Sequence, residues 1–211
     1  MKRLFRWLIA IAVLTGLCWR FPLFHVVSLQ QAQQEKAAAT FNPNEVAEKF
    51  WNERLLKSLD QAVKAEVLLP AIQTDATATR KKFSRSIGVS ESYTYFVSGT
   101  GRVLAVSVDE ISLAVTPGST NAEVSLQVGL LFSNAVRDGT GLLSVNDYPN
   151  SQDFNSISEA LNRIIEERVQ PRLRETAKVG SNVRFVGCAE VNDESSDLKP
   201  LKLVPIAATV E

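Results

Sequence analysis

The alternation of hydrophobic and polar positions divides the chain into a helical first part and a strand-rich second part. Between residues 41 and 85 the hydrophobic side chains recur at helical spacing, beginning with Val46, Phe50, Leu55 and Leu59. Asn42 followed by Pro43 is typical of a helix start, with Asn as the N-cap and Pro in the first turn. We predict a helical segment over 41–85 in which Pro70 ends or kinks one helix and Asp75 caps the next.

From residue 92 the hydrophobic period changes to two, which is typical of β-strands. The pattern predicts a turn at Gly99-Thr100-Gly101, because glycines at this spacing between strand-like runs favour a hairpin. Four short strands are then expected before residue 130, and they span 93–98, 102–108, 111–116 and 122–128.

One amphipathic helix interrupts the strands. It is predicted over 154–175 with Ser156 and Glu159 as its capping box, and two strands over about 182–191 and 201–210 follow. This order loosely resembles an OB-type barrel, whose helix falls between its third and fourth strands.

We therefore predict an α+β fold. A small antiparallel β-barrel spans 90–211, with the long helix inserted before its last two strands, and the helical segment 41–85 packs on this barrel.

The N-terminus has the charge pattern of a targeting segment. Three basic residues precede an uncharged apolar run from Trp7 to Trp19, and a helix that continues to about Phe24 is long enough to span a bilayer. No small-residue cleavage site follows at a suitable distance. We predict that 1–27 is an uncleaved signal anchor in the bacterial inner membrane, followed by a stalk over 28–40, with the domain on the periplasmic side.

Cys18 offers a second means of attachment. The run from Leu14 to Cys18 resembles a bacterial lipobox, although Leu17 occupies the position where that motif has a small residue. Lipidation of Cys18 is therefore the alternative to the uncleaved anchor. Cys188, the second of the two cysteines, lies in an apolar strand-like run and is expected to be a buried, inert thiol.

Charge and histidine content narrow the function classes. The chain has 23 basic and 23 acidic residues, and four of the basic ones precede residue 21, where there is no acid. The rest therefore carries a net charge of −4. This argues against a nucleic-acid partner, because affinity for nucleic acid depends largely on basic side chains that neutralise its phosphates. The single histidine, His25, adjoins the predicted anchor, so histidine-based triads and histidine-rich metal sites are not expected.

The densest run of hydrogen-bonding side chains extends from Val136 to Phe154. A connection this long and polar is either functional or an elaborate set of turns and caps. Within it, Arg137 and Asp147 are expected to project free of the strands, since they lie nearest to the two turns. The candidate ligand-binding residues are Arg137, Asp138, Asn146, Asp147, Asn150, Gln152 and Asp153.

Three readings of this polar run stay open: structural, ligand-binding and catalytic. Asp138, Asp147 and Asp153, with the amides of Asn146 and Asn150, have the oxygen chemistry of a hard-cation site, but their spacing differs from that of an EF-hand. Paired carboxylates also perform glycosidic acid/base chemistry. No nucleophile motif, Gly-rich phosphate loop or metal quartet accompanies them, and no metal or cofactor is expected.

A family resemblance covers about residues 18–210. Phe50-Trp51, Leu55-Leu56 and Gly99-Thr100-Gly101, together with Arg137-Asp138, Asn146-Asp147-Tyr148 and Asn150-Ser151-Gln152, resemble a bacterial family of predicted periplasmic lipoproteins, a domain of unknown function. Members of that family tend to be encoded near sugar-type ABC transport systems. The resemblance implies an accessory role in uptake, with transporter components or a small polar solute as partners, and supplies no catalytic residues.

The sequence thus predicts a membrane-tethered, non-catalytic periplasmic module that serves such an uptake system or binds a small solute. The alternative is an envelope hydrolase that uses the carboxylates around Asp138, Asp147 and Asp153.

Overall fold

The computed structural model describes residues 41–86 and 92–211, and Phe41–Glu211 form one compact unit. The predicted anchor over 1–27, the stalk over 28–40 and Cys18 lie outside the described residues. Within the described ranges, no helix combines the length and the apolar character needed to cross a membrane.

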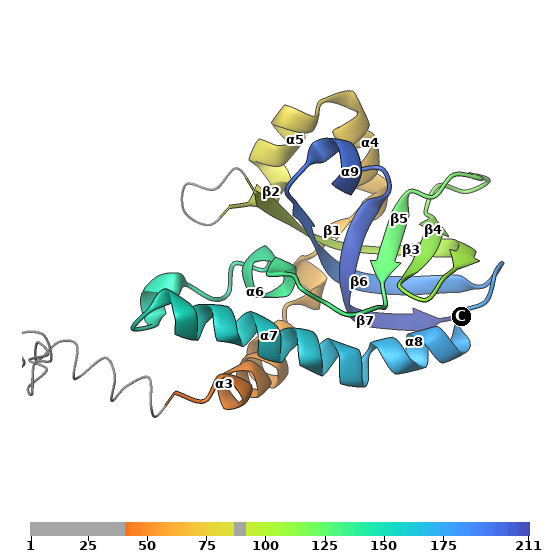
Figure 1. Cartoon of the computed structure of the whole chain (residues 1–211). Helices are drawn as coiled ribbons and strands as arrows, with labels where there is room; N and C mark the ends of the chain where they lie inside the picture. Colours follow the sequence, from red (N-terminus) through yellow and green to blue (C-terminus); the bar gives the residue numbers. More distant parts are fainter. Residues whose placement is uncertain (1–40, 87–91) are drawn as a thin grey trace, which may run out of the picture. The chain divides into compact units, whose positions relative to one another are not determined.

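Five strands, each paired with two of the others, form the centre of this unit (Figure 1). Their neighbours follow the order β3-β4-β5-β7-β6, and β6 pairs again with β3, so the pairings close a ring. The five strands are β3 (Tyr93–Val106), β4 (Glu110–Ala114), β5 (Val124–Gln127), β6 (Asn182–Val191) and β7 (Leu201–Val210).

The sheet is mixed, so the prediction of a purely antiparallel arrangement is wrong. β5 runs parallel to β7, and the two-residue strand β1 (Val63–Lys64) runs parallel to β3. A second short strand, β2 (Ser84–Arg85), pairs antiparallel with β3. The ring has five strands and its other four pairings are antiparallel, so the β5–β7 pair is necessarily parallel.

The predicted turn at Gly99-Thr100-Gly101 is wrong, because β3 passes through it as one continuous strand. A Cβ atom on Gly99 would lie 2.9 Å from Cβ of Ala65 and 3.0 Å from Cζ of Phe185. A Cβ atom on Gly101 would lie 2.9 Å from Cβ of Leu113. These glycines permit close packing against β3, which is the other common reason for glycine inside a strand. Three strands of the ring, β3, β4 and β5, therefore cover the region 93–128, where four were predicted.

The first part of the chain is helical, with two confirmed caps. Asn42 accepts hydrogen bonds from the backbone N–H groups of Asn44 and Glu45, and Asp75 accepts one from Ala78. Pro70 does not end its helix, which continues to Thr74 before the chain becomes extended at Asp75. The helical elements are α3 (Pro43–Phe50), the π-helical turn η1 (Trp51–Leu55), η2 (Leu59–Gln61), α4 (Ala65–Thr74) and α5 (Ala76–Phe83).

The long helix predicted over 154–175 is two helices, α7 (Ser151–Arg168) and α8 (Gln170–Thr176). It begins earlier than predicted because Asn150 caps it: Asn150 Oδ1 accepts from the N–H of Asp153, and its Nδ2 donates to Asp153 Oδ2. The capping box predicted at Ser156 and Glu159 is therefore wrong, since both residues lie inside α7. The remaining short helices are α6 (Ala135–Gly139), η3 (Val145–Asp147) and α9 (Glu194–Asp197).

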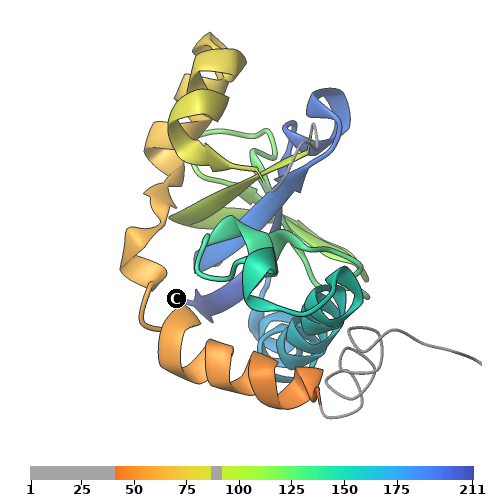
Figure 2. The same cartoon turned by 90° about the vertical axis from the view of Figure 1, so that its left-hand side faces the viewer.

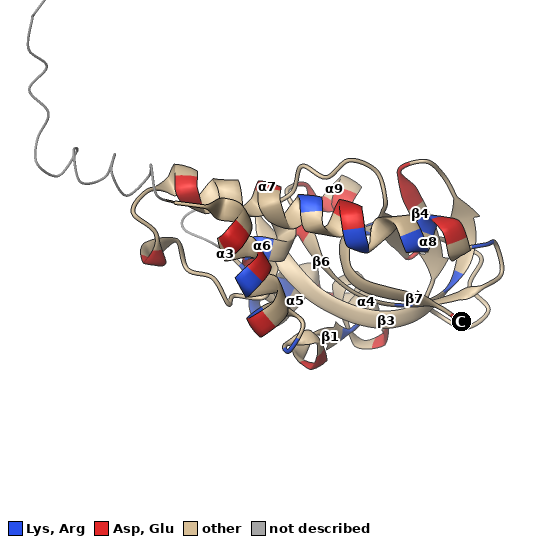
Figure 3. Cartoon of the chain, turned by 90° about the horizontal axis from the view of Figure 1, so that it is seen from below, with Lys and Arg blue, Asp and Glu red and all other residues tan. Residues whose placement is uncertain are grey.

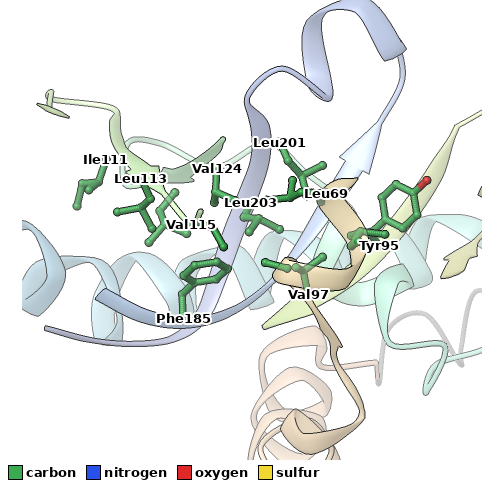
Figure 4. Close-up of a cluster of buried hydrophobic side chains, with 14 of the residues drawn as sticks. Leu69, Tyr95, Val97, Ile111, Leu113, Val115, Val124, Phe185, Leu201 and Leu203 are labelled. Atoms are coloured by element: carbon green, nitrogen blue, oxygen red, sulfur yellow. The ribbon is translucent and has the colours of Figure 1, made fainter. Parts of the chain in front are cut away.

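Two hydrophobic clusters hold these elements together. The first joins side chains of the five strands with α4 and α8, including Tyr95, Val97 and Phe185 (Figure 4). The second lies between the sheet and the helices α3, α6 and α7, and contains Phe96 and Cys188. Successive residues of β3 enter different clusters because side chains alternate across a strand.

The helices α3 and α7 pack against each other on one side of the sheet, while α4 and α5 lie on another (Figures 1 and 2). The outward sides of α3 and α7 carry charges of both signs (Figure 3), and Arg168 of α7 forms an ion pair with Glu48 of α3. The hydrophobic side of α7 is buried in the second cluster through Leu161 and Ile164, as the helical periodicity predicts.

Replacing Leu161 by Ala should lower the free energy of unfolding by about 2–5 kcal/mol, because the substitution leaves a cavity in the second cluster. Urea denaturation of the purified protein measures this loss. The control is Glu159→Ala, an exposed position on the same helix, which should change the unfolding free energy by less than about 0.5 kcal/mol. Equal midpoints for the two variants would contradict the packing of α7 described above.

Candidate functional site

The seven candidate residues do not form one cluster, because they are distributed over three elements. Arg137 and Asp138 belong to α6, and both line a cavity. Asn146 and Asp147 lie on η3, where both side chains are exposed. The other three, Asn150, Gln152 and Asp153, form the cap and first turn of α7.

Arg137 is buried, so the expectation that it projects freely is wrong. Its Nε donates to Asp138 Oδ1 over 2.5 Å and its Nη2 donates to Asp138 Oδ2 over 2.9 Å. Nη1 donates to Asn155 Oδ1 over 2.8 Å, and the guanidinium lies 4.0 Å from the ring centroid of Phe154. The side chain is 6% exposed, and it ties α6 to the start of α7.

Two other candidates, Asn150 and Asp153, also have structural roles. Asp153 is buried and, with Asn150, closes the reciprocal cap of α7. Gln152 is exposed in the first turn of that helix, and its carbonyl accepts from Ser156. Ligand binding by Asn146, Asp147 and Gln152 stays a prediction.

The cavity that includes Arg137 and Asp138 has a volume of about 270 Å³. It lies where β2, β3, β6 and α6 meet, and most of its lining is polar. The other polar residues around it are Arg85, Ser86, Ser92, Tyr93, Thr94, Asn134 and Glu190. We call this the α6 cavity.

Two carboxylates of the α6 cavity are held in place by neighbouring donors. Asp138 receives both hydrogen bonds from Arg137 described above. Glu190 Oε2 accepts from the hydroxyl of Ser133 over 2.7 Å and from the N–H of Asn134 over 3.0 Å. Both acids are thereby positioned before any ligand arrives.

Two side chains of the α6 cavity that can donate hydrogen bonds have no acceptor in the described part of the chain. Among the residues that the structure describes, neither the Arg85 guanidinium nor the Asn134 carboxamide makes a hydrogen bond. The Arg85 guanidinium lies against Gly141, where a Cβ atom would approach its Nη1 to 2.5 Å. Gly141 has a positive φ of 65°, so both its backbone and its neighbour favour glycine.

Seven of the nine lining residues were not among the sequence candidates, and the charged and amide residues in this group are Arg85, Asn134 and Glu190. Glu190 gave a usable signal, since it is the one charged residue in the otherwise apolar run 185–191. Asn134 and Arg85 gave none, because their approach to the cavity depends on how β2 and α6 meet β3.

An aromatic pair, Tyr93 and Tyr95, borders the cavity at Tyr93. The ring of Tyr93 meets that of Tyr95 edge-on, its hydroxyl donates to Glu194 of α9 over 2.9 Å, and Arg80 lies over its face. Burial, followed by the hydrogen bond to Glu194, raises the pKa of Tyr93. The hydroxyl therefore stays protonated and fixes α9 to β3.

Cys188 is fully buried, as predicted. Gly139 packs against it so closely that a Cβ atom there would lie 2.7 Å from Sγ. Burial, together with the negative charge of Asp138, raises the pKa of the thiol, so it does not ionise at neutral pH. Within 41–86 and 92–211, no three His, Cys, Asp or Glu side chains converge as a metal site would require.

Replacing Arg137 by Ala should lower the free energy of unfolding by about 3 kcal/mol, because it leaves the half-buried Asp138 carboxylate without its cation. Thermal melting measures the effect. Asp147→Ala, in the neighbouring exposed turn, should melt like the parent. The double variant Arg137→Ala/Asp138→Ala should recover part of the loss, and a parent-like melting temperature for Arg137→Ala would contradict the structural role.

Comparisons with known proteins agree with this fold. The crystal structure of an OB-fold protein from Thermotoga maritima matches with a TM-score of 0.72 and 23% identity, over 81% of this chain and 99% of that one. Among proteins with curated descriptions, none matches. The family model described as "Predicted periplasmic lipoprotein (DUF2291)" matches residues 8–209. The chain therefore has an OB-type fold and belongs to the DUF2291 family of predicted periplasmic lipoproteins.

Proposed function

We propose that the protein is a membrane-tethered, non-catalytic module of the bacterial periplasm that holds a small polar solute in the α6 cavity. Membership in a family of predicted periplasmic lipoproteins supports the location and the tether. The proposed attachment is the anchor over 1–27 in the inner membrane, with lipidation of Cys18 as the alternative.

The observation that carries the solute proposal is a pair of donors without a partner in the described part of the chain, the exposed Arg85 and the half-buried Asn134, beside two fixed carboxylates. Polar groups that converge on a cavity without partners of their own favour a ligand that supplies them. A volume of about 270 Å³ is at the small end for ligand sites, so it suits a solute of monosaccharide size.

The chemistry of the lining indicates the class of solute. Arg85 and Asn134 donate, whereas Asp138 and Glu190 accept. A solute with several hydroxyl groups can accept from the first pair and donate to the second. We therefore propose a small polyhydroxylated solute, such as a sugar.

This arrangement favours binding over the alternative hydrolase. Of the three loop carboxylates proposed for catalysis, the cavity lining contains Asp138 and lacks the other two. Asp138 is engaged by Arg137, Asp153 closes a helix cap, and Asp147 is exposed on η3.

A melting experiment with a panel of defined solutes tests the site. Purified protein is heated with millimolar monosaccharides, sugar acids or amino acids, and a sugar present at 100 times its Kd should add about 2.7 kcal/mol of stability. Arg85→Ala should abolish the shift while leaving the melting temperature of the free protein unchanged, because the guanidinium has no partner to lose.

The matched control is Arg172→Ala, an exposed arginine on α8, which should retain the full ligand-induced shift. A panel in which no solute raises the melting temperature would contradict the proposal. So would a shift that persists in Arg85→Ala.

The proposed physiological role is that of an accessory to a sugar-type ABC uptake system, which rests on the family resemblance and suits a small-sugar site. Co-purification of the tagged full-length protein from detergent-solubilised membranes tests it. Transporter subunits should be recovered at levels above those found with an unrelated tagged membrane protein. Their absence would remove the uptake role and leave the solute site untouched.

A further inference from the structure

The segment 129–134, between β5 and α6, is held by side chains from three other elements. Gln170 donates to the carbonyl of Gly129 over 2.9 Å, and Glu166 accepts from the N–H of Leu131 over 2.7 Å. Asn162 donates to the carbonyls of Leu131 and Ser133 over 3.3 and 3.0 Å. We call this segment the clamped loop.

Glu190 holds the far end of the clamped loop through Ser133 and the N–H of Asn134. At the near end, the N–H of Gly129 donates to the carbonyl of Asp109. The loop lacks secondary structure of its own, yet its backbone is fixed at both ends and in the middle. Asn162 and Gln170 are buried, so these hydrogen bonds are shielded from water.

Side chains of the clamped loop alternate between the core and solvent. Leu131 is 6% exposed and belongs to the second hydrophobic cluster. Its neighbours Leu130 and Phe132 are 78% and 92% exposed. Single exposed hydrophobic residues are common, but two large ones on the same side of an immobilised segment are not explained by packing.

The rigid backbone of the clamped loop favours binding through Leu130 and Phe132. A flexible loop would reduce its exposed apolar surface by folding over, whereas the clamped backbone keeps Leu130 and Phe132 in water. Because the loop is already ordered, a partner that covers these side chains gains the hydrophobic free energy without the cost of ordering the segment.

The charges beside the clamped loop define the partner further. Leu130 and Phe132 border a second cavity of about 300 Å³, whose lining also contains Glu190, Asp197 and Lys202. Lys202 pairs with Asp197 over 3.3 Å. Within the part of the chain that the structure describes, Glu190 has no cationic partner, so the cavity retains one uncompensated negative charge.

We propose that the clamped loop and this second cavity form a docking surface for a segment of another envelope protein. The segment carries an aliphatic or aromatic side chain that covers Leu130 and Phe132, and next to it a lysine or arginine that reaches Glu190. The acidic cavity favours such a protein segment over an anionic lipid surface, which Glu190 would repel.

Site-specific photocrosslinking in living cells tests the surface with the full-length protein. A photoreactive phenylalanine replaces Phe132, and the same group replaces Val108, which is 81% exposed in the β3–β4 connection. We expect a discrete protein product from position 132 and none from position 108. Mass spectrometry of the product should identify a partner peptide with a basic residue next to an apolar one.

Variants at nearby positions separate the contributions to docking. Leu130→Ser should reduce the product about tenfold, the size typical of losing an apolar anchor. Glu190→Gln should reduce it about threefold, because glutamine keeps an oxygen for Ser133 and Asn134 but removes the charge. Arg85→Ala, which lies in the α6 cavity, should leave the yield unchanged.

Several results would overturn the docking surface. These are equal products at positions 132 and 108, a product that consists of lipid or of a second copy of this chain, and a partner peptide without a basic residue. A yield that falls in Arg85→Ala but not in Leu130→Ser would assign the contact to the α6 cavity instead. Glu190 lines both cavities, so Glu190→Gln does not separate this proposal from the solute site; Arg85→Ala and Leu130→Ser, each confined to one cavity, do.

Discussion

The long strand β3 is the constraint on which the remaining structure depends. It pairs with β6 over ten residues and with β4, β1 and β2 along its other edge, so it closes the ring and joins the helical first part to the sheet. This is possible only if other elements approach its backbone closely at Gly99 and Gly101. Side chains at these two positions would displace α4, β4 and Phe185 together.

The closed ring also determines where polar side chains are needed. With each of the five ring strands paired on both sides, the segment that runs from Gln127 to the start of α7 has no free ring edge to pair with, and side chains satisfy several of its backbone groups. Arg137, Asn162, Glu166, Gln170 and Glu190 supply these hydrogen bonds. The polar groups of this segment that remain available for binding are those that these hydrogen bonds do not use.

The sequence predicted features that are set locally. The caps at Asn42 and Asp75, the burial of Leu161 and Ile164, and the inert Cys188 all follow from a few neighbouring residues, and the structure confirms them. The boundaries of the long helix were wrong because two overlapping polar patterns could each cap it, and only packing selects Asn150.

Features set by distant contacts could not be predicted. Strand periodicity is the same whether glycine marks a turn or a close approach of another element. The predicted turn within β3 and the predicted number of strands were therefore wrong. The parallel β5–β7 pair joins residues more than 70 positions apart, and no local pattern specifies it. Likewise, Arg85 and Glu190 meet at the α6 cavity only because β2 and β6 flank the same strand.

The two polar regions of this domain show why sequence polarity is a poor guide to binding surfaces. In 136–154, the charged and amide side chains attracted attention, but the fold uses Arg137, Asn150 and Asp153 for its own hydrogen bonds. In the clamped loop the relation is inverted: polar side chains of α7, α8 and β6 fix the backbone, and the loop's own hydrophobic side chains face water. A polar side chain whose hydrogen-bonding capacity is fully used within the protein contributes little to a ligand, whereas an apolar side chain held in solvent lowers its free energy when a partner covers it. In this fold the residues that remain available for binding are therefore defined by what the hydrogen-bond network leaves unsatisfied or uncovered.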